Sequence, residues 1–161
     1  MKPYDPQQAA RVWQRVQSQK QESPPQPDPA GDLPAMIMEE WLCATTFMQL
    51  ARQVSQRERA VLQRLSRECQ SQAAALKGIY NLTVGNRPVV KLPALQKDPV
   101  ELALRKCYSR QLRSLAVYEA RTSDPEYGPV FARMAQQKRE HCKSVLEVIG
   151  GLQQRESKNR K

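Results

Sequence analysis

Four long stretches of this chain place apolar residues every three or four positions, and that spacing restricts the chain to a helical fold. In each stretch the apolar side chains fall on one face of an α-helix, because residues i, i+3 and i+4 are neighbours there. No stretch shows the alternation of apolar and polar residues that indicates a β-strand. The sequence therefore predicts an all-α bundle with helices at about residues 34–55, 56–82, 99–122 and 126–152.

The connections between these helices differ in length, and the difference predicts the topology. Almost nothing separates the first helix from the second near Ser55, and Ser123-Asp124-Pro125 separates the third from the fourth. Short connections make consecutive helices antiparallel neighbours. Residues 85–98, by contrast, have no helical period, and these fourteen residues can extend up to about 46–50 Å. A helix of 20 to 25 residues is only roughly 30–38 Å long. We therefore expect two antiparallel pairs joined by a long crossover.

Proline separates the N-terminal residues from the predicted bundle. Residues 6–20 predict a short helix with Trp13 on its apolar side, whereas residues 22–32 hold four prolines and cannot be helical. Near the other end, Gly150-Gly151 weakens the last helix. We divide the chain into an N-terminal arm with its linker (1–31), a four-helix domain (32–153) and a basic disordered tail (154–161).

Composition and charge exclude several classes of protein. The chain of 161 residues has the length of one domain, and it lacks the run of about 20 apolar residues that crosses a bilayer. The N-terminus has no apolar signal segment, so we expect a cytoplasmic protein without a membrane span. The net charge of +10 suits a nucleic acid or an anionic surface. No basic motif interleaved with aromatic residues occurs, so nucleic-acid binding is kept only as an alternative.

The four cysteines lack the spacing of a zinc finger. All of them lie inside predicted helices, and the sequence contains no C-x-x-C motif. We expect small buried thiols in a reducing compartment. The alternative is a soft zinc or copper site built from Cys43, Cys69, Cys107 and His141.

Polar residues interrupt each apolar stripe near its middle. In chain order these are Glu40, then Cys69 with Gln72, then Gln111, and finally Lys138 with His141. In antiparallel pairs these positions fall at similar heights, so they would meet in one layer of the core. An unpaired cation in a core is costly, and we therefore expect Lys138 to pair with Glu40. The alternatives are a Lys138 side chain that reaches solvent and an ordinary hydrogen-bonded His141. A register shifted by one would instead point Glu68 and Ser71 inward.

The two halves of the predicted bundle share a pattern. Glu40 precedes Phe47 by seven residues, as Gln111 precedes Tyr118. Aligning the halves makes the Cys69-x-x-Gln72 motif correspond to Lys138-x-x-His141. This layout resembles the ferritin-like superfamily and is closest to its rubrerythrin-type branch. The resemblance covers residues 33–152, with segment 127–142 similar to the fourth-helix signature of that branch and segment 76–83 similar to the end of its second helix.

The resemblance implies a metal centre that has been lost. Ferritin-like bundles hold two irons with one Glu from each of two helices and a Glu-x-x-His motif from each of the other two. Of these ligands, the resemblance leaves Glu40 and His141 as remnants, and the four replaced positions are Cys69, Gln72, Gln111 and Lys138. With so few carboxylates remaining, too little negative charge is left to offset two irons. We therefore expect a non-catalytic structural or interaction module without a resident cofactor, acting as a homo-oligomer or with a protein partner. The alternative is an oxidoreductase that binds iron or zinc through an altered ligand set.

Overall fold

The computed structural model describes residues 31–160, and this part of the chain contains four α-helices and no β-strand. The helices are α2 (Leu33–Ala51), α3 (Gln56–Val84), α4 (Val100–Ala120) and α5 (Gly128–Asn159). The all-α prediction is confirmed. The predicted helix at residues 6–20 and the linker up to residue 30 lie outside the described residues.

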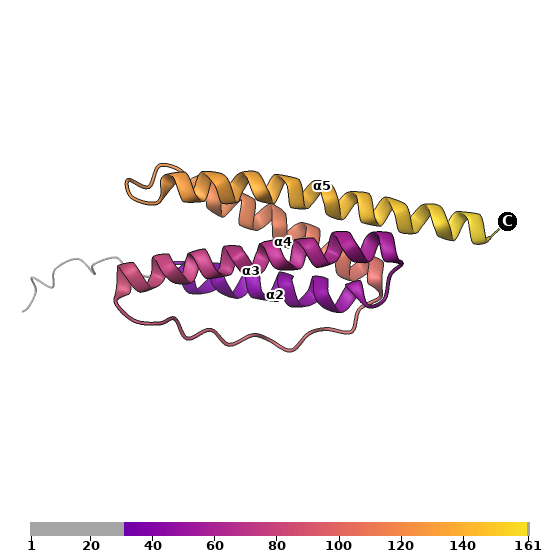
Figure 1. The fold of residues 1–161 in the computed structure, drawn as a ribbon, viewed down its shortest axis with the longest axis horizontal. Coiled ribbons are helices and arrows are strands. Elements are labelled where there is room, and N and C mark those ends of the chain that lie inside the picture. Colours follow the sequence, from indigo (N-terminus) through magenta and orange to yellow (C-terminus); the bar gives the residue numbers. More distant parts are fainter. Residues whose placement is uncertain (1–30, 161) are drawn as a thin grey trace, which may run out of the picture.

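The helices pack in two pairs, α2 against α3 and α4 against α5 (Figure 1). The segment between α3 and α4 runs extended along the bundle and returns the chain to the end where α3 began (Figure 1). Helix α4 therefore runs in the same direction as α3. This is the crossover that the length of the connection predicted.

Two glycines lie where the chain changes direction at one end of the bundle (Figure 1). Gly85 follows α3 with a φ of 82°, and its N–H donates to the carbonyl of Asn81 at 2.9 Å. A left-handed residue at this position ends a helix, and glycine adopts it without steric cost. Gly128 begins α5, and a Cβ there would collide with the carbonyl oxygen of Thr122. The short turn between α4 and α5 therefore requires glycine.

Helix α5 extends beyond the end that the sequence predicted. It continues through Gly150-Gly151 to Asn159, so the expected disorder of residues 154–161 was wrong for residues 154–159. Arg155 forms an ion pair with the buried Glu58 of α3, and Leu152 packs against the apolar core. A Cβ at Gly151 would lie 3.3 Å from Glu58 Oε1, so the missing side chain leaves room for this carboxylate. These contacts offset the roughly 1 kcal/mol that each glycine costs a helix.

Two apolar clusters fill the interior, one toward each end of the bundle. Phe47, Leu62, Leu104 and Val145 belong to one cluster, and Ile37, Leu76, Tyr118 and Phe131 belong to the other. Five buried polar residues lie between the two clusters in the sequence of their helices: Glu40, Gln72, Gln111, Lys138 and His141. The polar layer is therefore enclosed by apolar packing on both sides.

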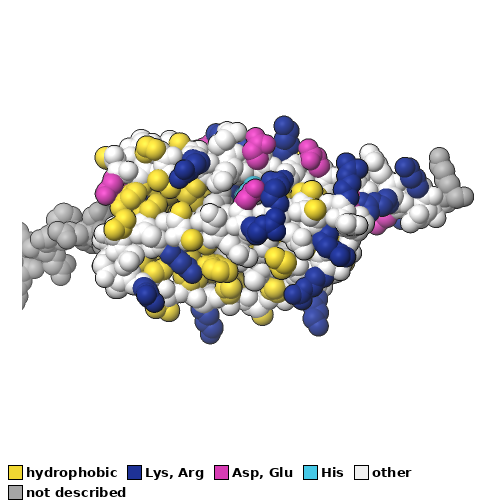
Figure 2. Space-filling view, in the orientation of Figure 1, with side chains coloured by type: hydrophobic (Ala, Val, Ile, Leu, Met, Phe, Trp, Pro, Cys, Tyr) yellow, Lys and Arg dark blue, Asp and Glu magenta, His cyan; other side chains and the backbone are white. Residues whose placement is uncertain are grey.

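The surface carries charges of both signs. Figure 2 shows Lys and Arg side chains spread over the visible face with Asp and Glu among them, beside exposed hydrophobic side chains. Several charged side chains of the described residues are paired, as in Arg105–Glu101 and Lys106–Asp98. Within residues 31–160, none of the helices combines the length and the hydropathy needed to cross a membrane.

Candidate functional site: a buried polar layer

All four helices contribute to one buried polar layer. The six predicted inward residues are each at most 3 % exposed: Glu40, Cys69, Gln72, Gln111, Lys138 and His141. The alternative register of α3 does not hold, because Ser71 is exposed and the side chain of Glu68 is 32 % exposed. The interrupted stripes of the sequence therefore mark the positions that meet in the core.

Lys138 lies at the centre of this layer. Its Nζ donates to Glu40 Oε2 at 2.7 Å and to Gln111 Oε1 at 2.9 Å, and it lies 3.9 Å from Cys69 Sγ. Burial is the largest influence and alone would lower the pKa of Lys138, but the charge of Glu40, its hydrogen bond to the ammonium and the neighbouring Cys69 and Cys43 together raise the pKa above the ordinary lysine value. Lys138 is therefore a buried ammonium paired with Glu40, as the sequence predicted, and it does not reach solvent.

The second oxygen of Glu40 is also satisfied. The hydroxyl of Tyr118 donates to Glu40 Oε1, so that α4 and α5 each supply a donor to this one carboxylate of α2. Burial, and then the charge of Glu40, raise the pKa of Tyr118 well above its ordinary value. The phenol therefore remains a donor at any physiological pH. The sequence indicated Tyr118 only as part of the repeated pattern, and this contact was not predicted.

His141 lies between two acceptors. Its Nδ1 is 3.1 Å from Gln111 Oε1, and its Nε2 is 2.8 Å from Glu68 Oε2. The orientation of Gln111 follows from Lys138, which has only donors and must face the amide oxygen. Only a doubly protonated ring donates to both acceptors. Burial, together with the charge of Lys138, lowers the pKa of His141 to about 4 against the opposing effect of Glu68, so at neutral pH the ring satisfies one acceptor at a time.

A chain of contacts links the layer to the surface between α3 and α5. Arg64 Nη1 lies 3.2 Å from Glu68 Oε1, and Arg64 Nη2 donates to Ser144 Oγ at 3.0 Å. From Glu68 the contacts continue through His141 and Gln111 to the Glu40–Lys138 pair. Glu68 thus contacts the layer from the partly exposed edge of the core. The alternative register of α3 had instead placed Glu68 inside the core.

Two amides in the layer are only partly satisfied. Gln72 donates to Gln137 Oε1 at 2.9 Å, a contact that the sequence did not predict. Among the described residues, Gln72 Oε1 and Gln111 Nε2 have no hydrogen-bond partner. An unpaired buried polar atom costs about 1–3 kcal/mol, so the layer does not contribute its full hydrogen-bonding capacity to stability.

The donor set of the layer does not fit a metal centre. Within residues 31–160, no three His, Cys, Asp or Glu side chains are grouped so that they could hold a metal ion. The alternative of a soft site built from Cys43, Cys69, Cys107 and His141 therefore finds no support in the described residues. Burial raises the pKa of the Cys43 and Cys69 thiols, and thiolates are what a soft metal requires. Glu40 and His141 do share the layer, but an ammonium lies beside them.

Comparison with known proteins finds no family model, no curated protein and no solved structure that matches this chain. The geometry of the polar layer therefore has to indicate the function. That geometry holds a compensated charge pair and a low-pKa imidazole inside a closed core, an arrangement that orients four helices relative to one another.

Proposed function

We propose that this chain is a ferritin-like bundle of the rubrerythrin type in which an internal salt bridge replaces the di-iron centre. It would serve as a non-catalytic structural or interaction module. The observation that carries the proposal is the 2.7 Å contact between Lys138 Nζ and Glu40 Oε2, with each side chain 1 % exposed. On this proposal, the positive charge of Lys138 occupies the position at which the family holds its irons. The crossover topology supports the same proposal.

The chemistry of the layer argues against redox catalysis at this position. A di-iron centre needs several ionised carboxylates to offset its charge and to bridge the metals. Glu40 is the one carboxylate that lies fully inside the layer, and Lys138 already neutralises it. A metal ion would have to displace the ammonium and then remain beside it. The layer therefore serves to orient the helices.

Metal analysis of the purified full-length protein tests this proposal. The protein is expressed in medium supplemented with iron or with zinc, and metal is measured by elemental analysis. We expect far less than one metal ion per chain in both preparations. Stoichiometric metal that disappears in a His141→Ala variant would refute the proposal and favour an oxidoreductase with an altered ligand set. The His141→Ala control separates binding in the layer from adventitious binding at the surface.

Homo-oligomerisation belongs to the same proposal and is measured separately. Ferritin-like bundles often dimerise, and this chain exposes large apolar side chains on α4 and α5, including Leu112 and Leu146. Light scattering coupled to size-exclusion chromatography gives the mass of the particle in solution. If the particle has the mass of a monomer at high micromolar concentration, the chain does not self-associate. The proposed interaction would then be with a different protein.

A further inference from the structure

The seam between α2 and α4 is open over the half that lies near the start of α2. A groove of about 210 Å³ occupies this half, and its walls are mainly apolar. Ala35 and Met36 of α2 form one side, and Val117 and Tyr118 of α4 form the other. Arg110 and Glu39, whose Nη1 and Oε2 are 2.9 Å apart, lie at the inner end of the groove.

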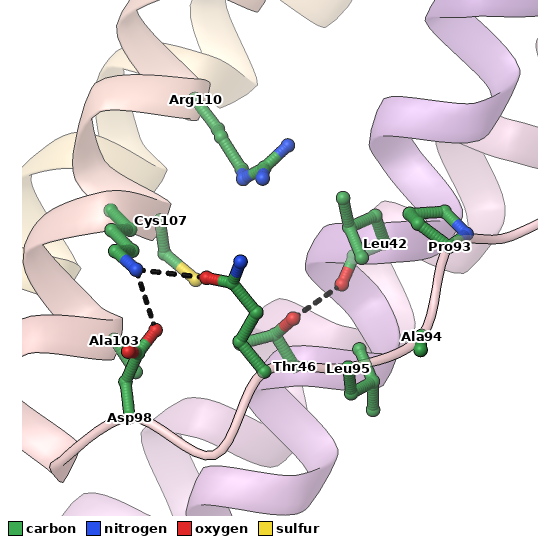
Figure 3. A pocket seen from close by; sticks show the side chains of 11 residues that line it. Leu42, Thr46, Pro93, Ala94, Leu95, Asp98, Ala103, Cys107 and Arg110 are labelled. Carbon is green, nitrogen blue, oxygen red and sulfur yellow. Dashed lines mark hydrogen bonds and ion pairs between the residues drawn. The ribbon is translucent and has the colours of Figure 1, made fainter.

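The other half of the same seam is covered by the chain itself. Pro93, Ala94 and Leu95 of the crossover lie beside Leu42 and line a pocket whose opposite wall includes Cys107, as Figure 3 shows. Only a pocket of about 130 Å³ remains beneath them. An extended segment that contains proline thus closes one half of the seam, and the Glu39–Arg110 pair marks the boundary with the open half.

The chain enters the bundle at the rim of the open groove. Asp32 lines the groove, and its Oδ1 lies 2.7 Å from Nη1 of Arg121, the residue that follows α4. Gly31 before it has a φ of 50°. Thirty residues precede Gly31. Residues 21–31, which contain all four prolines of the linker, span up to about 34 Å when extended as polyproline II, so the residues before them can reach every part of the groove.

We propose that the N-terminal segment, residues 6–20, packs on the open half of the α2/α4 seam with the Trp13 indole in the groove. Trp13 is the largest apolar side chain among the first thirty residues and lies on the apolar side of the helix that the sequence predicts there. Its indole suits the volume and the apolar walls of the groove. The segment would complete the cover that the crossover begins.

Such a cover has a consequence for the polar layer. Tyr118, which lines the groove, donates its hydroxyl to Glu40 inside the bundle. Excluding water from the groove lowers the local dielectric around this contact and strengthens the electrostatic attraction between Glu40 and Lys138. The arm and the layer would therefore stabilise each other, whether or not the bundle is ferritin-like.

Cysteine protection in the full-length protein tests the docking. Val117→Cys places a thiol in the groove, and Ser109→Cys places one on an exposed part of α4 as the control. The four native cysteines are buried and react slowly by comparison. We expect Trp13→Ser to raise the maleimide labelling rate at position 117 by about tenfold, as for a segment docked about 90 % of the time, and to leave position 109 unchanged.

Two outcomes would overturn the docking. One is an equal labelling rate at position 117 with and without Trp13. The other is protection that depends on protein concentration but not on Trp13, which would assign the cover to a second copy of the chain. Ala35→Cys, an exposed position in the same groove, repeats the measurement if Val117→Cys disturbs the fold by circular dichroism. In a Trp41→Phe background, Trp13 is the only tryptophan. Acrylamide quenching of its fluorescence that is weaker than quenching of a fully exposed tryptophan is an independent sign of docking.

Discussion

Lys138 Nζ lies 2.7 Å from Glu40 Oε2, and the two residues are 98 positions apart in the sequence. Each side chain is fully buried, and each has a further partner: Gln111 for the ammonium and Tyr118 for the carboxylate. Moving each of these charges out of water costs several kcal/mol. Their close contact and their further hydrogen bonds compensate that cost. The pair therefore fixes how α2 and α5 are placed relative to each other.

Removing one partner of this pair should be worse than removing both. Glu40→Ala leaves the ammonium buried without a counter-charge, and we expect a loss of about 3–5 kcal/mol in the free energy of unfolding. The double variant Glu40→Ala/Lys138→Met replaces both charges with apolar groups and should regain most of that loss. Urea denaturation measures both. A single variant that is no less stable than the double variant would contradict the pairing.

The neighbouring ion pair gives a matched control. Glu39 Oε2 lies 2.9 Å from Arg110 Nη1, but these side chains are about 30 % exposed. Exposed pairs contribute about 0–1 kcal/mol because water screens them. Glu39→Ala should therefore change stability far less than Glu40→Ala, although the two residues are adjacent on the same helix.

The hydroxyl of Tyr118 should contribute measurably to stability. Tyr118→Phe removes the donor to Glu40 Oε1 and leaves a buried charged oxygen with one partner fewer. We expect a loss of about 1–3 kcal/mol, measured as the change in free energy of unfolding. Tyr108→Phe is the control, since Tyr108 is only partly buried at the edge of the core. Equal effects of the two changes would show that the contact with Glu40 contributes nothing specific.

The sole histidine gives a direct probe of charge in the layer. Because the chain has one histidine, its ring signals in a proton NMR titration belong to His141. We expect a pKa of about 4, below the ordinary value of 6.5, because of burial and the charge of Lys138. Glu68→Gln should lower it further, and Glu40→Ala/Lys138→Met should raise it. A pKa near 6.5 in the wild-type protein would contradict the closed, positively charged environment.

The same lowered pKa predicts how stability depends on pH. The unfolded chain binds a proton at His141 below about pH 6.5, whereas the folded chain binds it only near pH 4. The contribution of His141 is therefore fully present above pH 6.5 and is lost as the pH falls toward 4, by roughly 3 kcal/mol. Urea titrations at several pH values measure it, and His141→Gln should flatten the dependence across that window. An unchanged slope in the variant would assign the effect to other groups.

Much of the fold follows from local pattern. The spacing of apolar residues and the prolines at residues 88, 93, 99 and 125 place the helices, because periodicity and backbone geometry act within a few residues. The polar layer follows from the same pattern, since a polar residue on an apolar stripe must face the interior. The Glu40–Lys138 pair then follows from the cost of burying an ammonium alone.

The features that the sequence did not predict depend on contacts between distant helices. Gly150-Gly151 indicated the end of α5, but the Arg155–Glu58 ion pair and the close approach of α3 keep the helix intact. Glu68 lies off the stripe of α3 and reaches His141 from the side, and Gln137 reaches Gln72 in the same way. Residues at the edge of a helix face a neighbouring helix or solvent according to the packing, which a single helix pattern does not specify.

Replacing the ammonium should convert the layer into a metal site if the bundle has a ferritin-like origin. Lys138→Glu together with Gln111→Glu supplies two carboxylates beside Glu40 and His141, at the positions where Lys138 Nζ and Gln111 Oε1 now touch. We expect this double variant to bind Fe²⁺ or Co²⁺ near stoichiometrically and to gain thermal stability on binding, because carboxylates offset the metal charge. Lys138→Met/Gln111→Leu, which removes the ammonium without adding ligands, should bind no metal. A folded carboxylate variant that takes up no more metal than this control would show that the helices do not hold the layer in metal-binding geometry.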